Sequence, residues 1–348
     1  MNVAVVDPYN VIQDPEMSTL ALALDPVHVA QEFRKKLPHI FSTQDVDLVS
    51  IRVIRHKPLR RCMIEYAFNR TIPGGAVEKV VLIGKVMAHR YGKSGYRLLQ
   101  ALWNTGFDAR SEDGVSVPEP IGHIPSLQMW LQRKVPGRIA TDLLTTPEGP
   151  GLLRRIALAA HKLHTARVAT TKSHTMTDEI RILWERVPKV ALAQPAWSSR
   201  IDNLLKMAEQ LGAMLPPGES CGIHRDFYSD QIIVDDTRLH LIDFDLYCNG
   251  SPGLDIGNFI GHITELSLRT SGDPHTLVHL EQAIEDEFVA LSGPSLRAEV
   301  KTYAALTRVR HIYISTLFSE RRSYTKTLLD YCEQELTEMI TQPACAQV

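Results

Sequence analysis

The chain has 348 residues, of which 44% are hydrophobic and 22% are charged, a composition typical of a globular protein long enough for two packed lobes. Its formal net charge is -2 and it contains no long run of one sign, which does not favour nucleic acid or a membrane surface as a partner. No stretch approaches the roughly 20 apolar residues that span a bilayer, and the opening segment lacks a signal-peptide pattern, so we expect a cytoplasmic protein.

Five cysteines are scattered along the chain, and an odd, scattered set argues against a disulfide framework and fits a reducing compartment. They are Cys62, Cys221, Cys248, Cys332 and Cys345. Cys221, His224 and Cys248 lack a fourth ligand at the usual spacing of a zinc site. We therefore expect free thiols.

The first part of the chain is predicted to be rich in β-structure. Residues 1 to about 24 show little pattern and are expected to form a loose extension, whereas Asp25 and Pro26 provide the N-cap and first residue of a helix that runs through Leu37. Alternating or continuous apolar residues predict five strands of a small antiparallel sheet, and helical spacing predicts one helix at 96–103. The expected strands are 49–53, 62–68, 79–87, 115–118 and 127–132.

The second part of the chain is predicted to be mainly helical. The expected helices are 141–166, 177–185, 199–214, 254–268, 275–291 and two or more between 296 and 339. One β-hairpin, 231–234 with 239–242, interrupts them. The predicted fold is therefore α+β with two lobes, a smaller β-rich lobe at 1–134 and a larger, mainly helical lobe at 135–348.

Acidic and amide side chains recur at fixed offsets in the segment 221–259. Asp226 precedes Gln231, and Asp243 lies at the end of the expected hairpin, which brings it back toward Asp226. Phosphoryl transfer needs one carboxylate near the acceptor hydroxyl, oxygen ligands for Mg²⁺, and a cation on the phosphates. This segment offers candidates for the first two requirements.

Each candidate residue type suits one task. Asp226 would orient the hydroxyl and accept its proton, while Asp243 and the amide oxygen of Gln231 would supply the hard oxygen ligands that Mg²⁺ prefers. Lys85 stands alone in an apolar strand and would reach the α- and β-phosphates of ATP as a point charge. Asp245 is either a second metal contact or a solvated loop carboxylate.

Residues 224–231 (HRDFYSDQ) resemble the H-x-D-x-x-x-x-N catalytic loop of the aminoglycoside phosphotransferase and choline kinase-like family. Residues 242–245 (IDFD) are similar to its I-D-[FW]-[DE] metal motif, and residues 250–255 (GSPGLD) to its G-D-P-x-x-D element. Two shorter elements, 163–164 (LH) and 135–137 (VPG), also resemble the family pattern. The resemblance extends over roughly residues 45–320.

The resemblance implies a protein-kinase-like fold and an ATP- and Mg²⁺-dependent kinase that phosphorylates a small hydroxylated molecule. It assigns Asp226 as catalytic base, Gln231 and Asp243 as metal ligands, and Lys85 as phosphate ligand. Backbone groups near Gln132, Arg133 and Lys134 would meet the adenine. Asp255 would brace the catalytic loop from the start of its helix. His224 is expected to be structural.

The acceptor is not determined by the sequence. Sugars, amino sugars, amino alcohols and nucleoside-like antibiotics are all candidates, and the lack of a dense acidic cluster favours a neutral sugar or metabolite. We expect its pocket in helical segments after Leu254 and in the loop around Tyr247. Arg308, Arg310 and His311 either touch a substrate or form a solvated helix face, and the solvated face is the favoured interpretation.

Two departures from the family pattern keep an alternative open. Gln231 stands where Asn is usual, and the helix expected at 96–103 contains no Glu or Asp to pair with Lys85. A nucleotide-binding pseudokinase without turnover is therefore the alternative function. A protein kinase is less favoured, because no glycine follows Asp243 and Phe244.

Overall fold

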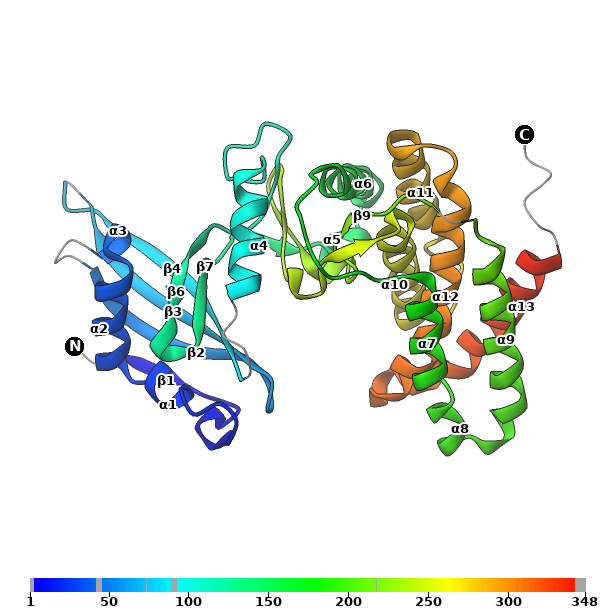
Figure 1. Cartoon of the computed structure of the whole chain (residues 1–348), viewed down its shortest axis with the longest axis horizontal. Helices are drawn as coiled ribbons and strands as arrows, with labels where there is room; N and C mark the ends of the chain where they lie inside the picture. Colours follow the sequence, from blue (N-terminus) through cyan, green and yellow to red (C-terminus); the bar gives the residue numbers. More distant parts are fainter. Residues whose placement is uncertain (1–2, 42–45, 73, 89–92, 217, 342–348) are drawn as a thin grey trace. The chain divides into compact units, whose positions relative to one another are not determined.

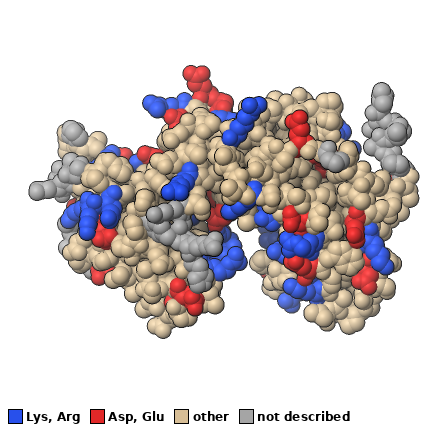
Figure 2. All heavy atoms as spheres, in the orientation of Figure 1, with Lys and Arg blue, Asp and Glu red and all other residues tan. Residues whose placement is uncertain are grey.

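The computed structural model describes residues 3–41, 46–72, 74–88, 93–216 and 218–341. The chain divides into two compact units (Figure 1). The first unit comprises Met1–Gly137 with Asp235–Ile242, and the second comprises Arg138–Val234 with Asp243–Val348. Acidic and basic side chains are intermixed on the face shown in Figure 2, in keeping with the small net charge.

A six-stranded sheet forms the centre of the first unit, with strand order β1-β2-β3-β4-β7-β6. Its strands are β1 (Ala4–Val6), β2 (Val46–Lys57), β3 (Arg61–Thr71), β4 (Val77–Met87), β6 (Pro120–Ile124) and β7 (Met129–Arg133). All neighbouring pairs are antiparallel except β1 with β2, which are parallel. The three long strands β2, β3 and β4 confirm the predicted hairpin and central strand.

The N-terminal residues are part of this unit rather than a loose extension. Ala4 pairs with Ser50 at the sheet edge, and the side chains of Met17 and Leu20 are buried in the core below the sheet. The prediction for residues 1 to about 24 was therefore wrong. The short elements here, β1, η1 (Val11–Gln13) and α1 (Leu20–Ala23), are too brief to show a periodicity, and packing against the sheet determines their structure.

Helix α2 (Pro26–Lys36) covers the sheet and confirms the predicted helix start. The side chain of Asp25 accepts a hydrogen bond from the backbone N–H of Val27, as an N-cap residue does. Phe33 packs on the sheet, with its ring centroid 5.0 Å from that of Tyr66. The short α3 (Pro38–Phe41) follows, and α4 (Lys93–Asn104) confirms the helix expected at 96–103.

One predicted strand belongs elsewhere. β5 (Val115–Ser116) does not join the six-stranded sheet but pairs in parallel with β11 (Arg238–Leu241), with Val115 opposite Leu239. The hydroxyl of Ser116 lies 2.9 Å from Nδ1 of His240, which ties the two strands together. The position expected for this strand in the sheet is taken by β6, which the sequence pattern did not indicate because Pro120 and Gly122 interrupt it.

The second unit is mainly helical. Its longer helices are α6 (Gly149–Thr165), α7 (Met176–Arg186), α9 (Ser198–Met214), α10 (Pro252–Ser271), α11 (Val278–Ser292), α12 (Leu296–Thr316) and α13 (Thr325–Thr341). Shorter elements are α5 (Thr141–Leu144), α8 (Lys189–Ala193), β8 (Arg138–Ile139), β9 (Cys221–Ile223), β10 (Ile232–Asp235), β12 (Cys248–Gly250) and the 3₁₀ turns η4 (Ser229–Gln231), η5 (Phe244–Leu246) and η6 (Ser319–Tyr324). The single helix predicted at 141–166 is divided near Pro147, because proline disfavours the helical conformation of the residue before it.

Helices α10 and α12 approach each other closely along a row of glycines in α10. A Cβ atom at Gly257 would lie 2.5 Å from Cβ of Tyr303 and 2.6 Å from the backbone nitrogen of Ala304. Gly253 and Gly261, four residues to either side, are equally crowded. The two backbones can therefore pack this closely only without side chains at these positions, and this packing fixes α10 beside the segment that follows β9. No helix among the described residues is both long and apolar enough to cross a bilayer.

Candidate active site

Residues 224–231 form a loop that leaves β9 and ends in η4, and a buried carboxylate holds its start. Asp255, fully buried in the first turn of α10, accepts hydrogen bonds from the backbone N–H groups of His224 at 2.9 Å and Arg225 at 2.7 Å. Nε2 of His164 lies 2.9 Å from the same carboxylate. Arg225 has a left-handed backbone conformation, with φ of 69°. The predicted bracing role of Asp255 is confirmed.

The loop places Asp226 and Gln231 together. The amide nitrogen of Gln231 lies 3.5 Å from Oδ2 of Asp226, a long hydrogen bond that leaves the amide oxygen of Gln231 available for another contact. Gln231 is buried, whereas Asp226 is only partly buried. Asn258 of α10 donates to the backbone carbonyl of Phe227 at 2.9 Å and fixes the middle of the loop.

The segment that carries Asp243 packs against the start of the loop. Asp243 has φ of 61° and ψ of 58°, a left-handed conformation that Asp tolerates better than most residues. The ring of the next residue, Phe244, lies 4.8 Å from that of His224, which is fully buried, as a structural role requires. Within the described residues, no three side chains of His, Cys, Asp or Glu are grouped so that they could hold a metal ion.

A cavity of about 200 Å³ in the second unit contains Asp226 in its wall. Side chains from the loop 224–231, η5 and helices α7, α10 and α12 line it: Glu179, Ile182, Arg186, Arg225, Asp226, Tyr228, Leu246, His262, Arg310 and Ile314. Leu246, beside Tyr247, and helices α10 and α12, which follow Leu254, belong to the segments in which we expect the acceptor pocket. The contribution of α7 lies outside those segments.

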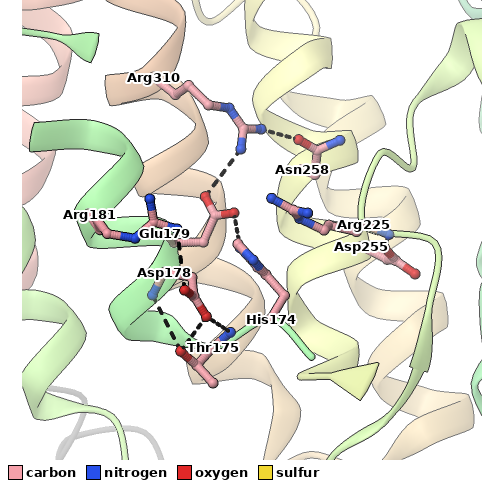
Figure 3. A network of polar contacts seen from close by, with 9 residues as sticks. All are labelled: His174, Thr175, Asp178, Glu179, Arg181, Arg225, Asp255, Asn258 and Arg310. Atoms are coloured by element: carbon pink, nitrogen blue, oxygen red, sulfur yellow. Dashed lines mark hydrogen bonds and ion pairs between the residues drawn. The ribbon is translucent and has the colours of Figure 1, made fainter. Parts of the chain in front are cut away.

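A buried ion pair forms one wall of this cavity (Figure 3). Glu179, 2% exposed, lies with Oε1 2.6 Å from Nε2 of His174 and with Oε2 3.1 Å from Nη1 of Arg310. Arg310 also donates to the amide oxygen of Asn258. Burial acts to raise the pKa of Glu179, but Arg310, His174 and Arg225 outweigh it and the pKa is lowered. Glu179 is therefore ionised at neutral pH.

The basic run near the C-terminus is not a solvated helix face, so that interpretation was wrong. Arg308 is buried, with Nη2 2.8 Å from Oε2 of Glu281, and His311 is also buried. Only Arg310 of the three reaches the cavity. The reason is that α12 packs against α10 along much of its length, so its polar residues need buried partners.

Two stacked rings form another part of the cavity wall. The rings of Tyr228 and His262 are 4.2 Å apart with an angle of 17° between their planes. His262 meets the ring of His311 edge to face at 4.5 Å. Burial lowers the pKa of His262 well below its usual value, and His311 and Arg310 reinforce the effect, so the His262 ring is neutral at pH 7.

Lys85 lies in β4 of the first unit, with its side chain 4% exposed. It faces Trp130 of β7, and Nζ lies 5.1 Å from the ring centroid, a cation–π contact. The lysine is thus held against the sheet rather than extended into solvent.

Gln132, Arg133 and Lys134 follow in β7 and directly after it. The side chains of Arg133 and Lys134 form ion pairs with Glu119 at 2.5 Å and Glu65 at 2.6 Å. Their backbone N–H groups donate to the carbonyls of Glu119 and Val81, both at 2.9 Å. These two N–H groups are therefore already used within the first unit.

The sequence pattern of the Phosphotransferase enzyme family matches residues 95–290, more than half of the chain. The chain belongs to this family. The match includes the loop 224–231, Asp243 and the helix that carries Asp255. No curated protein sequence matches the chain.

Solved structures of phosphotransferases share the fold. Choline kinase from Cryptosporidium parvum Iowa II has a TM-score of 0.57 at 13% identity, over 91% of this chain and 97% of that one. A choline/ethanolamine kinase family protein from Mesorhizobium loti has a TM-score of 0.54 at 14% identity, over 88% of this chain and 94% of that one. A thermostable mutant of aminoglycoside phosphotransferase APH(4)-Ia, in a ternary complex with AMP-PNP and hygromycin B, has a TM-score of 0.53 at 16% identity, over 92% of this chain and 99% of that one. The predicted α+β, protein-kinase-like fold is confirmed.

Proposed function

We propose that this member of the phosphotransferase family is an ATP-dependent small-molecule kinase. It would transfer the γ-phosphate of ATP to a hydroxyl of a sugar, amino sugar or amino alcohol. The observation that carries the proposal is the position of Asp226, a partly buried carboxylate on a braced loop in the wall of a cavity. The APH(4)-Ia structure with AMP-PNP and hygromycin B, a protein with the same fold, supports a nucleotide and a small hydroxylated acceptor as the two substrates.

In the proposed reaction, the acceptor oxygen attacks the γ-phosphorus while the bond to the β,γ-bridging oxygen breaks, and ADP leaves. Asp226 orients the acceptor hydroxyl and takes its proton. Gln231 steadies Asp226 through its amide N–H. Asp255 does not contact the substrates in this proposal; it positions Asp226 by accepting hydrogen bonds from the backbone of the two preceding residues.

Gln231 and Asp243 carry donor atoms of the kind that magnesium prefers. The amide oxygen of Gln231 is not used in its contact with Asp226, and Asp243 adds a carboxylate, so both donors are hard oxygen atoms. We propose these two residues as the protein ligands. Bound Mg²⁺ with ATP would neutralise charge on the phosphate oxygens.

The nucleotide would contact residues of the proposed nucleotide-binding lobe, 1–134. Lys85 would bind the α- and β-phosphates, and its contact with Trp130 supports a fixed orientation of its side chain. Backbone groups near Gln132, Arg133 and Lys134 would meet the adenine, and the N–H groups of Arg133 and Lys134 would not take part because they already donate to Glu119 and Val81. Residues 135–348 would form the catalytic and acceptor-binding lobe.

A nucleotide-binding and turnover assay tests this proposal. ATP binding and ADP release would be measured with and without Mg²⁺, against a panel of neutral, cationic and anionic hydroxylated acceptors. We expect Mg²⁺-dependent ADP release that requires an acceptor. ATP binding without ADP release on any acceptor would instead identify a pseudokinase.

A further inference from the structure

The cavity beside Asp226 is rich in arginine. Arg186 reaches it from the end of α7, Arg225 from the catalytic loop and Arg310 from α12, whereas the acidic residues in its wall are Glu179 and Asp226. His262, the remaining titratable imidazole of the wall, is neutral at pH 7 because burial lowers its pKa. The wall therefore carries three positive charges against two negative ones.

The negative charge of Glu179 is not shared equally among the three arginines, because both of its carboxylate oxygens already contact His174 and Arg310. One oxygen contacts His174 at 2.6 Å and the other contacts Arg310 at 3.1 Å (Figure 3). Arg310 is thereby paired and also bonded to Asn258. Of the three arginines, Arg186 and Arg225 remain without a carboxylate within hydrogen-bond distance among the described residues.

The guanidinium groups of Arg186 and Arg225 form no hydrogen bond or ion pair with any residue in the described part of the chain, although the charge of Arg225 lies near enough to Glu179 to lower the pKa of that carboxyl. The backbone of Arg225 is fixed by Asp255, and its side chain points toward Glu179 and Arg310 in Figure 3. Arg186 is exposed at the end of α7, so it lies at the rim. Two guanidinium groups thus face one cavity, with Asp226 as the remaining carboxylate.

A guanidinium binds carboxylate and phosphate oxygens through parallel hydrogen bonds, and such charge-assisted pairs are stronger than neutral ones. An anionic ligand would complete the charge balance of the wall, since the like charges of Arg186, Arg225 and Arg310 repel one another. A cationic ligand would add to that repulsion. The volume of about 200 Å³ is smaller than a drug-sized pocket and suits a small metabolite.

We propose that the acceptor carries an anionic group, a carboxylate or a phosphate ester, that Arg225 and Arg186 bind while its hydroxyl lies at Asp226. This inference rests on the proposed kinase function and narrows its acceptor to anionic members such as sugar acids, sugar phosphates or hydroxy acids. The stacked rings of Tyr228 and His262 provide an uncharged wall for the carbon skeleton.

The test compares acceptors that differ only in charge. Steady-state phosphorylation would be measured for a neutral sugar, its sugar acid, its phosphate ester and its amino derivative, with the full-length protein and ATP. We expect kcat/KM for an anionic acceptor to exceed that for the neutral one by about tenfold or more. The sugar acid and the phosphate ester distinguish carboxylate from phosphate recognition.

Two variants and a matched control assign the effect to the arginines. Arg186→Gln and Arg225→Gln should each raise KM for the anionic acceptor about tenfold, with a smaller change for the neutral one. Arg181→Gln is the control, because Arg181 lies on the same helix but pairs with Glu185 at 2.7 Å and does not line the cavity.

Each outcome decides between the claims. Turnover that favours neutral or cationic acceptors, or unchanged charge discrimination in Arg186→Gln, would overturn the inference and leave the kinase proposal standing. ATP binding without turnover on any member of the panel would overturn the kinase proposal itself, and the inference with it.

Discussion

The carboxylate of Asp255 lies 2.7 Å from the backbone nitrogen of Arg225, across 30 residues of sequence. This hydrogen bond holds the loop 224–231 in a left-handed turn immediately before Asp226. It connects the start of α10, which the glycine row packs onto α12, to the residue proposed as catalytic base. The position of Asp226 therefore depends on the packing of two helices that do not carry it.

Replacement of Asp255 by Asn should weaken this connection. An amide has one acceptor oxygen where the carboxylate has two, so one buried N–H of the loop would lose a charge-assisted partner. We expect Asp255→Asn to lower the free energy of unfolding by about 2 kcal/mol. Denaturant titration would measure this, with Asp202→Asn, on the exposed side of α9, as the control. Equal stability of the two variants would argue against the bracing role.

The close packing of α10 on α12 predicts how glycine-to-alanine substitutions change the stability of the protein. Gly257→Ala would force a Cβ against the backbone of Ala304, which cannot move as a side chain can, and should cost about 2 kcal/mol of stability. Gly151→Ala in α6 has nothing within 4 Å of the added Cβ and should stabilise by about 0.5 to 1 kcal/mol. The two substitutions are chemically identical, so opposite signs in thermal unfolding would show that the helix contact is the cause. A stabilising Gly257→Ala would contradict it.

Protonation of His311 should make stability depend on pH. Burial, followed by the charges of Arg310 and Arg321, lowers its pKa from 6.5 to about 3 in the folded state. The unfolded chain therefore binds a proton at His311 at higher pH than the folded chain does. The stability of the folded state is unaffected by His311 protonation above about pH 6.5, and it falls as the pH drops from there toward 3.

Unfolding free energies of the wild type and His311→Met, measured from pH 7 to pH 4, would isolate this effect. The free energy of unfolding of the wild type should fall relative to that of His311→Met as the pH falls below 6.5, by at most about 1.4 kcal/mol per pH unit. Parallel curves over this range would show that His311 does not titrate differently in the two states.

Sequence patterns predicted most of the helices, because these depend on local spacing, whereas the bracing of the loop by Asp255 was expected from the resemblance to a known family. The walls of the cavity beside Asp226 could not be predicted in the same way. Glu179 and Arg310 lie 131 residues apart, and only the tertiary packing of α7 and α12 joins them. The glycines at 253, 257 and 261 were a usable signal, since a row at four-residue spacing indicates a tight helix contact.

The run at 308–311 and the N-terminal segment misled the sequence interpretation for opposite reasons. Basic residues on a helix usually mark a solvated face, but Arg308 is buried through its pairs with Glu281 and Glu335. Residues 4–6 and 20–23 form elements too short to show periodicity, and contact with the sheet fixes them. In both cases long-range contacts outweighed the local pattern.

Phosphorylation of an acceptor hydroxyl by wild-type protein and by Asp226→Asn tests the central claim most directly. ATP carrying a labelled γ-phosphate would be incubated with Mg²⁺ and the acceptor panel, and the label followed into the product by mass spectrometry. We predict transfer to a hydroxyl by the wild type and a loss of about 10² to 10⁴ in kcat for Asp226→Asn, with ATP still bound. Equal transfer by both proteins would contradict the role of Asp226 as base, and no transfer by the wild type would contradict the kinase assignment.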